Sequence, residues 1–306
     1  MSGVPQGSVL GPICFIIYIN SIDKSLTDKD SFISKFADDT KVGRAILSVN
    51  DNVILQNDLN ALVDWSKTWK MQFNASKCKI LHFGRTNPQH SYYMEGVELE
   101  KSDKEKDVGV LITNTLKPTS QCSTAAARAN SVLGQMSRAL SFRNKKTWIP
   151  LYKTYVRPHL EYCAQAWSPW TQHDTDLLEN VQKRAVRMTS GLQGQSYEDK
   201  LSELGLTTLS ERRIRGDLIM VWKILHNHDD VSYSTWFRLA SSDAVQNTRL
   251  SSGLLNLRQS RFNSETRRHF FSQRVIEKWN NLPETVKNAP SVNSFKNNYD
   301  NWLKNQ

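Results

Sequence analysis

The feature that most constrains the fold is a change in the spacing of apolar residues near Pro118. Before this residue, short apolar runs alternate with turn residues, which is typical of short strands beside a helix. After it, apolar residues recur every three or four positions, which predicts helices that pack by one face. The sequence therefore predicts the α+β class, with a mixed N-terminal part and a mostly helical C-terminal part.

Several elements are predicted before Pro118. Residues 11–26 are expected to form a short buried helix, because isoleucines crowd one side of it. Residues 32–42 are expected to form two short strands around a tight turn. Further elements, in chain order, are an amphipathic helix that has Asp51 as its N-cap and reaches Trp69, a strand at 78–83, a hairpin at 92–99 and a strand at 108–112.

After Pro118, helices are predicted at 125–140, 145–157, 174–189, 208–226, 264–281 and 291–303. The first of them has alanines on its apolar face, which would permit close packing. Ser291, after a proline, is the expected N-cap of the last. Residues 229–263 are rich in polar residues and are interpreted as a surface loop.

The net charge of the 306 residues is +10, and its position along the chain is informative. Residues 1–120 hold 14 Lys and Arg against 14 Asp and Glu, whereas residues 121–306 hold 26 against 16. An excess spread over several helices favours a polyanionic partner for the second part. The alternative is an ordinary solubilising surface.

The apolar runs and the cysteines indicate the cellular compartment of the protein. The longest apolar run, residues 12–19, is far shorter than the ~20 residues of a membrane helix, and no signal peptide is evident. The cysteines include no C-x-x-C pair and no zinc-like spacing with histidines. We therefore expect no membrane partner and an intracellular protein, nuclear or cytoplasmic.

Asp38 and Asp39 are adjacent at the predicted tight turn. Neighbouring carboxylates suit hard divalent cations such as Mg²⁺, because these ions prefer oxygen ligands. Two such ions can stabilise both the attacking and the leaving oxygens of a phosphoryl transfer. The alternative is that the pair is simply solvated, as most Asp-Asp turns are.

The loop from Gly3 to Pro12 contains three glycines and two prolines in ten residues. Such a loop has a fixed shape and lets the backbone approach a ligand closely. Gln6 offers both a hydrogen-bond donor and an acceptor there. The alternative is an ordinary loop that enters a helix.

Taken together, the loop (G-V-P-Q-G-S-V-L-G-P) and the F-A-D-D box at residues 36–39 resemble the signature pair of reverse transcriptases from jockey-like non-LTR (LINE-type) retrotransposons. Residues 73–79 (FNASKCK) are similar to the N-x-x-K motif of that family. Residues 107–110 (DVGV) are similar to its primer-grip hairpin, which more usually reads Leu-Gly-Val. Residues 151–170 and 178–188 are similar to the segments that follow the thumb.

The resemblance implies an RNA-directed DNA polymerase, with an RNA template, a DNA primer and deoxynucleotide triphosphates as partners. It implies Mg²⁺ or Mn²⁺ as the cofactor and two-metal nucleotidyl transfer as the reaction. Asp38 would be a catalytic, metal-binding carboxylate of the palm. Asp39 would be its less directly coordinating neighbour.

The resemblance also assigns residues to the nucleotide and the primer. Gln6 and Gly7 would lie against the incoming nucleotide, and Lys77 would approach its phosphates. Gly109 and its flanking residues would hold the primer end. Without the family, Lys77 is a surface lysine beside a strand.

The same resemblance divides the chain into four parts: a partial palm at 1–86, a primer-grip-like hairpin region at 87–117, thumb-like helices at 118–160 and a basic helical region at 161–306. In the family, fingers and a palm strand with another aspartate precede the Gly3 loop. Because this chain starts at Met1, we expect its site to be incomplete and the chain alone to be inactive or weakly active. The alternative is a catalytically inactive remnant that binds nucleic acid.

Basic residues in the second part are candidates for phosphate contacts. Lys183, Arg184 and Arg187 share one helix face, and further clusters comprise Arg212, Arg213 and Arg215, then Arg258, Arg261, Arg267, Arg268 and Arg274. Trp167, Trp170 and Trp222 could stack on bases. We interpret Trp222 as a core residue instead, because its spacing is helical. The sequence leaves template preference and oligomeric state open.

Overall fold

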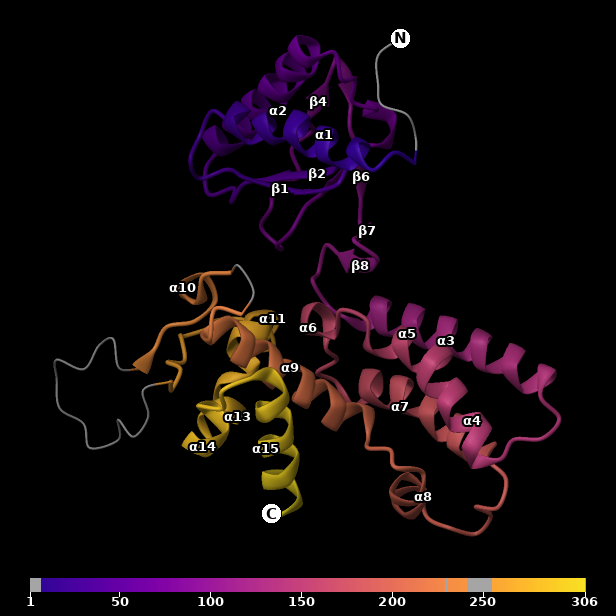
Figure 1. The fold of residues 1–306 in the computed structure, drawn as a ribbon. Coiled ribbons are helices and arrows are strands. Elements are labelled where there is room, and N and C mark those ends of the chain that lie inside the picture. The colour runs from indigo at the N-terminus through magenta and orange to yellow at the C-terminus, as the bar shows by residue number, and fades with distance from the viewer. Residues whose placement is uncertain (1–6, 229–230, 241–254, 306) are drawn as a thin grey trace. The chain divides into compact units, whose positions relative to one another are not determined.

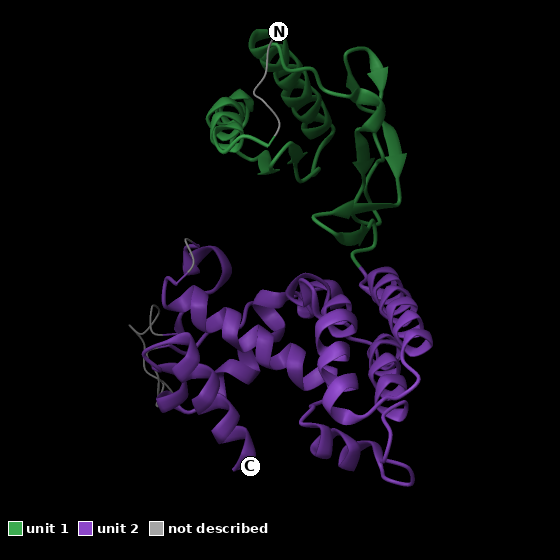
Figure 2. Ribbon diagram, turned by 45° about the vertical axis from the view of Figure 1, so that its right-hand side comes forward, with its two compact units in different colours: residues 1–116 green, residues 117–306 purple. Residues whose placement is uncertain are grey.

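The computed structural model describes residues 7–228, 231–240 and 255–305. The chain forms two compact units, which Figure 2 colours separately: unit 1, residues 1–116, and unit 2, residues 117–306. The division lies next to Pro118, where the spacing of apolar residues changes. Unit 1 mixes strands and helices and the described part of unit 2 is mostly helical, which confirms the α+β prediction. The division into four parts stays a prediction.

Unit 1 combines two helices with four two-stranded sheets (Figure 1). Three sheets are antiparallel hairpins, β1–β2, β4–β5 and β7–β8, whereas β3 pairs with β6 in parallel. Its elements are α1 (Leu10–Ile19), η1 (Asn20–Ser25), β1 (Phe32–Phe36), β2 (Asp39–Gly43), α2 (Val49–Trp69), η2 (Ala75–Lys77), β3 (Lys79–Leu81), β4 (Tyr93–Met94), β5 (Val97–Glu98), β6 (Glu100–Ser102), β7 (Lys104–Asp107) and β8 (Val110–Thr113).

Helix α2 is a central packing element of unit 1. Its buried Leu62 and Trp65 pack with Ile19 and Ile22, and Ile33 and Val42 of the β1–β2 hairpin join the same cluster. This apolar contact places the hairpin against α2.

The N-cap of α2 is Ser48, so the prediction of Asp51 was wrong by three residues. Asp51 is the third helical residue. It accepts from the Ser48 backbone N–H (2.7 Å), completing a reciprocal capping box. Ser and Asp are both common at the start of helices, and in this capping box both side chains bind backbone N–H groups.

The prediction that residues 11–26 form a buried helix was wrong in two respects. The α-helix ends at Ile19 and continues as the 3₁₀ helix η1. Ile13, Ile16 and Ile17 are 52%, 62% and 71% exposed, whereas Ile19 is buried. Helix α1 is apolar on nearly all sides, so its periodicity could not indicate which face packs against unit 1.

Unit 2 consists mainly of helices in the part that the structure describes. They are α3 (Thr119–Ala139), α4 (Lys145–Leu151), the π-helix η3 (Tyr152–Val156), α5 (Arg157–Glu161), α6 (Ala164–Trp167), α7 (Gln172–Arg187), α8 (Tyr197–Leu204), α9 (Leu209–Leu225), α10 (Tyr233–Trp236), α11 (Glu265–Arg268), α12 (Phe271–Arg274), α13 (Ile276–Asn280), α14 (Glu284–Lys287) and α15 (Val292–Lys304). None of the described helices has both the length and the hydropathy that crossing a bilayer requires.

Two packed regions organise unit 2. Helix α3 lies against α7 and buries Ala125, Ala126 and Ala129, as the small residues predicted. A second core surrounds α9, with Trp279 and Phe295 fully buried. These contacts determine which faces of α7 and α9 are buried and which remain exposed.

The prediction for residues 264–281 was a single helix, but three short helices, α11 to α13, occupy the segment. The N-cap Ser291 is confirmed, because its hydroxyl accepts from the Ser294 N–H at 3.1 Å. The surface-loop prediction for 229–263 was wrong at Phe237 and Leu257, which are buried in the α9 core. Residues 229–230 and 241–254 of that loop lie outside the described residues.

Candidate functional site

The two acidic residues lie at the turn of the β1–β2 hairpin. Phe36 pairs with Asp39, so Ala37 and Asp38 form a two-residue loop, as the tight turn predicted. Ala37 has φ 52°, a left-handed conformation that costs a non-glycine residue about 1–2 kcal/mol. The turn therefore holds a strained backbone directly before the two carboxylates.

Asp38 and Asp39 both face solvent. In the described part of the chain, neither forms an ion pair with a basic side chain. Their negative charges are thus not neutralised inside unit 1. Two adjacent carboxylates in this state can accept an external cation.

Arg44, directly after β2, fastens the hairpin to α2. Its side chain is 7% exposed, with Nη1 2.7 Å from Asp28 Oδ1 and Nε 3.0 Å from Asp51 Oδ1. The hydrogen bond from Arg44, followed by that from Ser48, lowers the pKa of Asp51 to about 2. The sequence patterns did not single out Arg44. The signal that could have indicated it is Asp51, an acidic residue near the start of α2 that needs a basic partner.

The β7–β8 hairpin contains Gly109 in its turn. Val108 and Gly109 both have positive φ, 42° and 85°, as two-residue hairpin loops of the primed type require. The Nζ of Lys41 on β2 lies 2.6 Å from Asp107 Oδ2, at the end of β7. This ion pair joins the β1–β2 hairpin to the β7–β8 hairpin. Lys41 is two residues from Asp39, so the contact lies close to the acidic turn.

The predicted nucleotide-binding residues are less connected. Gln6 lies outside the described residues. Gly7 is exposed with φ 80°, in a position with open space around its Cα. Lys77 is exposed at the end of η2, and the contacts described for unit 1 do not join it to the β1–β2 turn. Phe73, four residues earlier, packs in the same cluster as the hairpin.

The side chains of unit 1 fit a divalent cation in part. Mg²⁺ in phosphate-handling enzymes is held by one or two carboxylates, with waters and substrate phosphates as further ligands. Asp38 and Asp39 can supply such carboxylates. Within the described residues, no group of three or more His, Cys, Asp or Glu could hold a metal ion, so the further ligands would have to be of another kind or origin.

The basic face of α7 consists of Lys183, Arg184 and Arg187. The buried face of the helix packs against α3 and α9. Lys183 lies over the Tyr197 ring at 5.5 Å, and Arg184 donates to Asn130 Oδ1 at 3.2 Å. Arg184 and Arg187 are exposed, and none of the three has an ion-pair partner among the described carboxylates. Their charges can reach an external anion.

The three arginines at the start of α9 differ from that pattern. Arg212 forms a two-pronged ion pair with Glu161, and Arg215 forms one with Asp300 at 2.7 and 2.8 Å. Arg213 is 6% exposed. In this conformation Arg212 and Arg215 hold unit 2 together rather than present charge to solvent, whereas Arg213 is buried without an ion pair among the described residues.

The third basic cluster, at residues 258–274, contains both a paired arginine and exposed ones. Arg274 is held by Asp217, whereas Arg258, Arg261, Arg267 and Arg268 are exposed. Among the tryptophans, Trp222 is 4% exposed, which confirms that it is a core residue. Trp167 is equally buried, so it is unavailable for stacking on bases. Trp170 is half-buried and stacks on His269.

Comparison with known families supports the resemblance that the motifs suggested. Residues 1–128 match the reverse transcriptase (RNA-dependent DNA polymerase) family. This segment covers unit 1, including the β1–β2 and β7–β8 hairpins, and the start of α3. No solved structure matches the chain.

Curated relatives match a longer part of the chain. The RNA-directed DNA polymerase from mobile element jockey of Drosophila melanogaster is 25% identical over 202 residues, and its counterpart from Drosophila funebris is 26% identical over 202 residues. The probable RNA-directed DNA polymerase from transposon X-element of Drosophila melanogaster is 27% identical over 200 residues. Each alignment covers 62% of this chain and 22% of the relative. The chain thus spans about a fifth of the length of these relatives.

Proposed function

We propose that this chain, whose residues 1–128 match the reverse transcriptase family, is part of an RNA-directed DNA polymerase of a non-LTR retrotransposon. The observation that carries the proposal is the β1–β2 turn, which presents Asp38 and Asp39 to solvent without an internal counter-ion. In this proposal unit 1 belongs to the palm. Unit 2 begins with the thumb and continues as the helical region that binds nucleic acid.

Each hairpin has a separate role in this proposal. The strained turn at Ala37 orients Asp38 and Asp39, which would hold the metal ion. The β7–β8 turn supports the primer end, because Gly109 has no side chain and lets a backbone approach closely. The exposed Lys41–Asp107 ion pair links the two hairpins.

The metal and Lys77 would share the work of charge stabilisation. Bound Mg²⁺ or Mn²⁺ supplies positive charge beside the phosphate oxygens during nucleotidyl transfer. Lys77 is exposed and can move to meet the nucleotide phosphates. A lysine ammonium offers three donors, which suits this contact.

Primer extension tests the proposal. Purified chain would be mixed with an RNA template, an annealed DNA primer, deoxynucleotide triphosphates and Mg²⁺ or Mn²⁺. We expect at most weak extension, which Asp38→Asn abolishes, because a lost metal ligand removes several kcal/mol of transition-state stabilisation. Asp64→Asn is the matched control: Asp64 is exposed on α2, paired only with Lys67 at 3.4 Å, and we expect no change.

The outcomes separate clearly. Extension that survives Asp38→Asn would contradict the assignment of the site. Template binding should be equal in both variants, measured by fluorescence anisotropy of labelled RNA, because the substitution touches no cation of unit 2.

A second candidate function is nucleic-acid binding without catalysis. The observation in its favour is the basic face of α7, where Arg184 and Arg187 are exposed and have no described carboxylate partner, in the part of the chain that carries the whole excess charge. Its signature is the absence of extension by the unmodified chain together with RNA binding that weakens as salt rises. Extension by the unmodified chain excludes it.

A further inference from the structure

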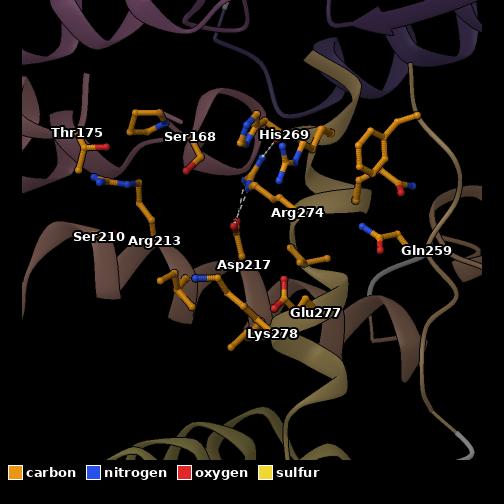
Figure 3. Close-up of a pocket in the computed structure, with 17 residues that line it drawn as sticks. Ser168, Thr175, Ser210, Arg213, Asp217, Gln259, His269, Arg274, Glu277 and Lys278 are labelled. Carbon is orange, nitrogen blue, oxygen red and sulfur yellow. Dashed lines mark hydrogen bonds and ion pairs between the residues drawn. The ribbon is translucent and has the colours of Figure 1, made fainter. Parts of the chain in front are cut away.

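Unit 2 contains a pocket of about 590 Å³, drawn in Figure 3. It lies between α7, α9 and the α11–α13 segment, and residues 259–262 close one side of it. The volume is within the range of pockets that hold small ligands. Neither the reverse transcriptase match at residues 1–128 nor the motifs of unit 1 explain it.

One wall of the pocket is an internal ion pair. Arg274 donates from Nε and Nη2 to the carboxylate of Asp217 at 2.9 and 3.0 Å, and from Nη1 to the His269 carbonyl at 3.1 Å (Figure 3). Its Nη2 also donates to the Gln165 carbonyl at 3.0 Å. Both charges are satisfied by each other, so neither is available to a ligand.

Arg213 is different. It lines the pocket, is 6% exposed, and its Nη1 has no hydrogen-bond partner among the described atoms. In Figure 3 its guanidinium points toward Thr175 and away from Asp217. The carboxylates of Glu179, Glu161 and Asp217 partly offset the charge of Arg213. A buried N–H donor without a partner is still unfavourable unless a ligand or water completes it. The orphan donor therefore marks a place for an acceptor.

Two further cations lie at the pocket. Lys278 is exposed and has no ion-pair partner among the described residues. Arg268 has only the solvent-exposed Glu265, at 3.6 Å, a type of pair worth less than about 1 kcal/mol. Among the described residues, the exposed Glu277 is the one lining carboxylate besides Asp217. After the Arg274–Asp217 pair is set aside, the lining keeps an excess of positive charge.

We propose that this pocket binds one nucleotide unit of single-stranded nucleic acid, with its phosphate held by Arg213, Arg268 and Lys278. The half-buried Phe262 provides apolar surface for the sugar and base, above the buried Leu218 and Val275. A nucleotide combines these two chemistries, because its charged phosphate is joined to a flat apolar base. The inference rests on the proposed nucleic-acid role of unit 2 and gives it a defined site.

Calorimetric titration of the whole chain with adenosine monophosphate tests the inference without polymerase activity. We expect the double variant Arg268→Ala, Lys278→Ala to weaken binding by at least about tenfold, because it removes two of the phosphate contacts. The matched control is Arg128→Ala, Lys304→Ala, which removes the same charge from unit 2 at exposed positions outside the pocket. We expect less than about a twofold change there.

Three ligands then separate the possible sources of binding. Adenosine, which lacks the phosphate, and inorganic phosphate, which lacks the nucleoside, should each bind more weakly than adenosine monophosphate. Equal loss in the two double variants, or equal binding of phosphate and nucleotide, would overturn the inference. Because no template or extension is needed, a chain that fails to polymerise still gives a clear result here.

A competition with single-stranded RNA completes the test. If the pocket serves a strand, labelled oligoadenylate should be displaced by adenosine monophosphate from the unmodified chain. The same oligonucleotide should lose affinity in the pocket variant. Unchanged oligoadenylate affinity in that variant would overturn the assignment to a strand.

Discussion

Unit 1 and unit 2 place their charges in opposite ways. Residues 1–120 are electrically neutral overall, yet the β1–β2 turn leaves Asp38 and Asp39 without internal partners. Residues 121–306 carry all of the excess positive charge, but some of their basic residues are paired inside the unit, as in Arg212–Glu161 and Arg215–Asp300. Net charge therefore says less about a binding surface than the subset of charges that the fold leaves unpaired.

The same contrast appears between two helices of unit 2. Helix α7 leaves Arg184 and Arg187 exposed and Lys183 half-buried without a described carboxylate partner, whereas α9 directs Arg212 and Arg215 into ion pairs and buries Arg213. Basic residues at helical spacing are thus either a contact surface or internal fasteners. The difference depends on whether a carboxylate from another helix lies within reach.

The largest effect on binding should come from α7. We expect Lys183→Ala, Arg184→Ala and Arg187→Ala together to lower RNA affinity by about 10- to 100-fold and to reduce the salt slope by about 2 for a single strand. Anisotropy titrations over a range of salt concentrations measure both quantities. The matched control removes Lys24, Lys29 and Lys67 from unit 1, which changes net charge equally.

Equal losses in those two triple variants would break the comparison between the units. That result would mean that total charge, rather than the α7 face, controls binding.

A pH effect of intermediate size is expected in unit 1. Asp51 has a pKa of about 2 in the folded chain, against about 3.9 for an unperturbed aspartate. The unfolded state binds the proton more readily, so the stabilisation is complete above about pH 4 and is lost as pH falls toward 2. Hydrogen exchange of α2 peptides, read by mass spectrometry, should show this loss.

Asp51→Asn provides the comparison, since it removes the titrating group. Its α2 exchange should be faster at neutral pH and should depend less on acid than that of the unmodified chain. An unchanged acid response in this variant would contradict the role assigned to the Arg44–Asp51 contact.

The smallest effect should come from α9. Arg215 and Asp300 are partly exposed, so Arg215→Ala with Asp300→Ala should cost at most about 1 kcal/mol of unfolding free energy. RNA affinity should change by less than about twofold. Chemical denaturation and anisotropy measure the two effects. A large loss of RNA affinity would show that α9 contributes to the binding surface after all.

Periodicity and turn chemistry predicted much of the fold. The β1–β2 hairpin, the hairpin around Glu95 and Gly96, helix α7 and the N-cap at Ser291 appear as expected, because each depends on residues close in sequence. The predictions for α1, for residues 229–263 and for residues 264–281 were wrong, because burial there depends on partners distant in sequence.

The sequence by itself determined the motif residues, the turn that carries Asp38 and Asp39, and the location of the excess charge after residue 120. Tertiary structure alone decided which charges remain available. Arg44 reaches Asp28 and Asp51, Lys41 reaches Asp107, and Arg213 is left in a pocket with an unmatched donor. The physical reason is that an ion pair requires its two groups to be within about 4 Å. Spacing along one helix cannot reveal what another helix brings to that distance.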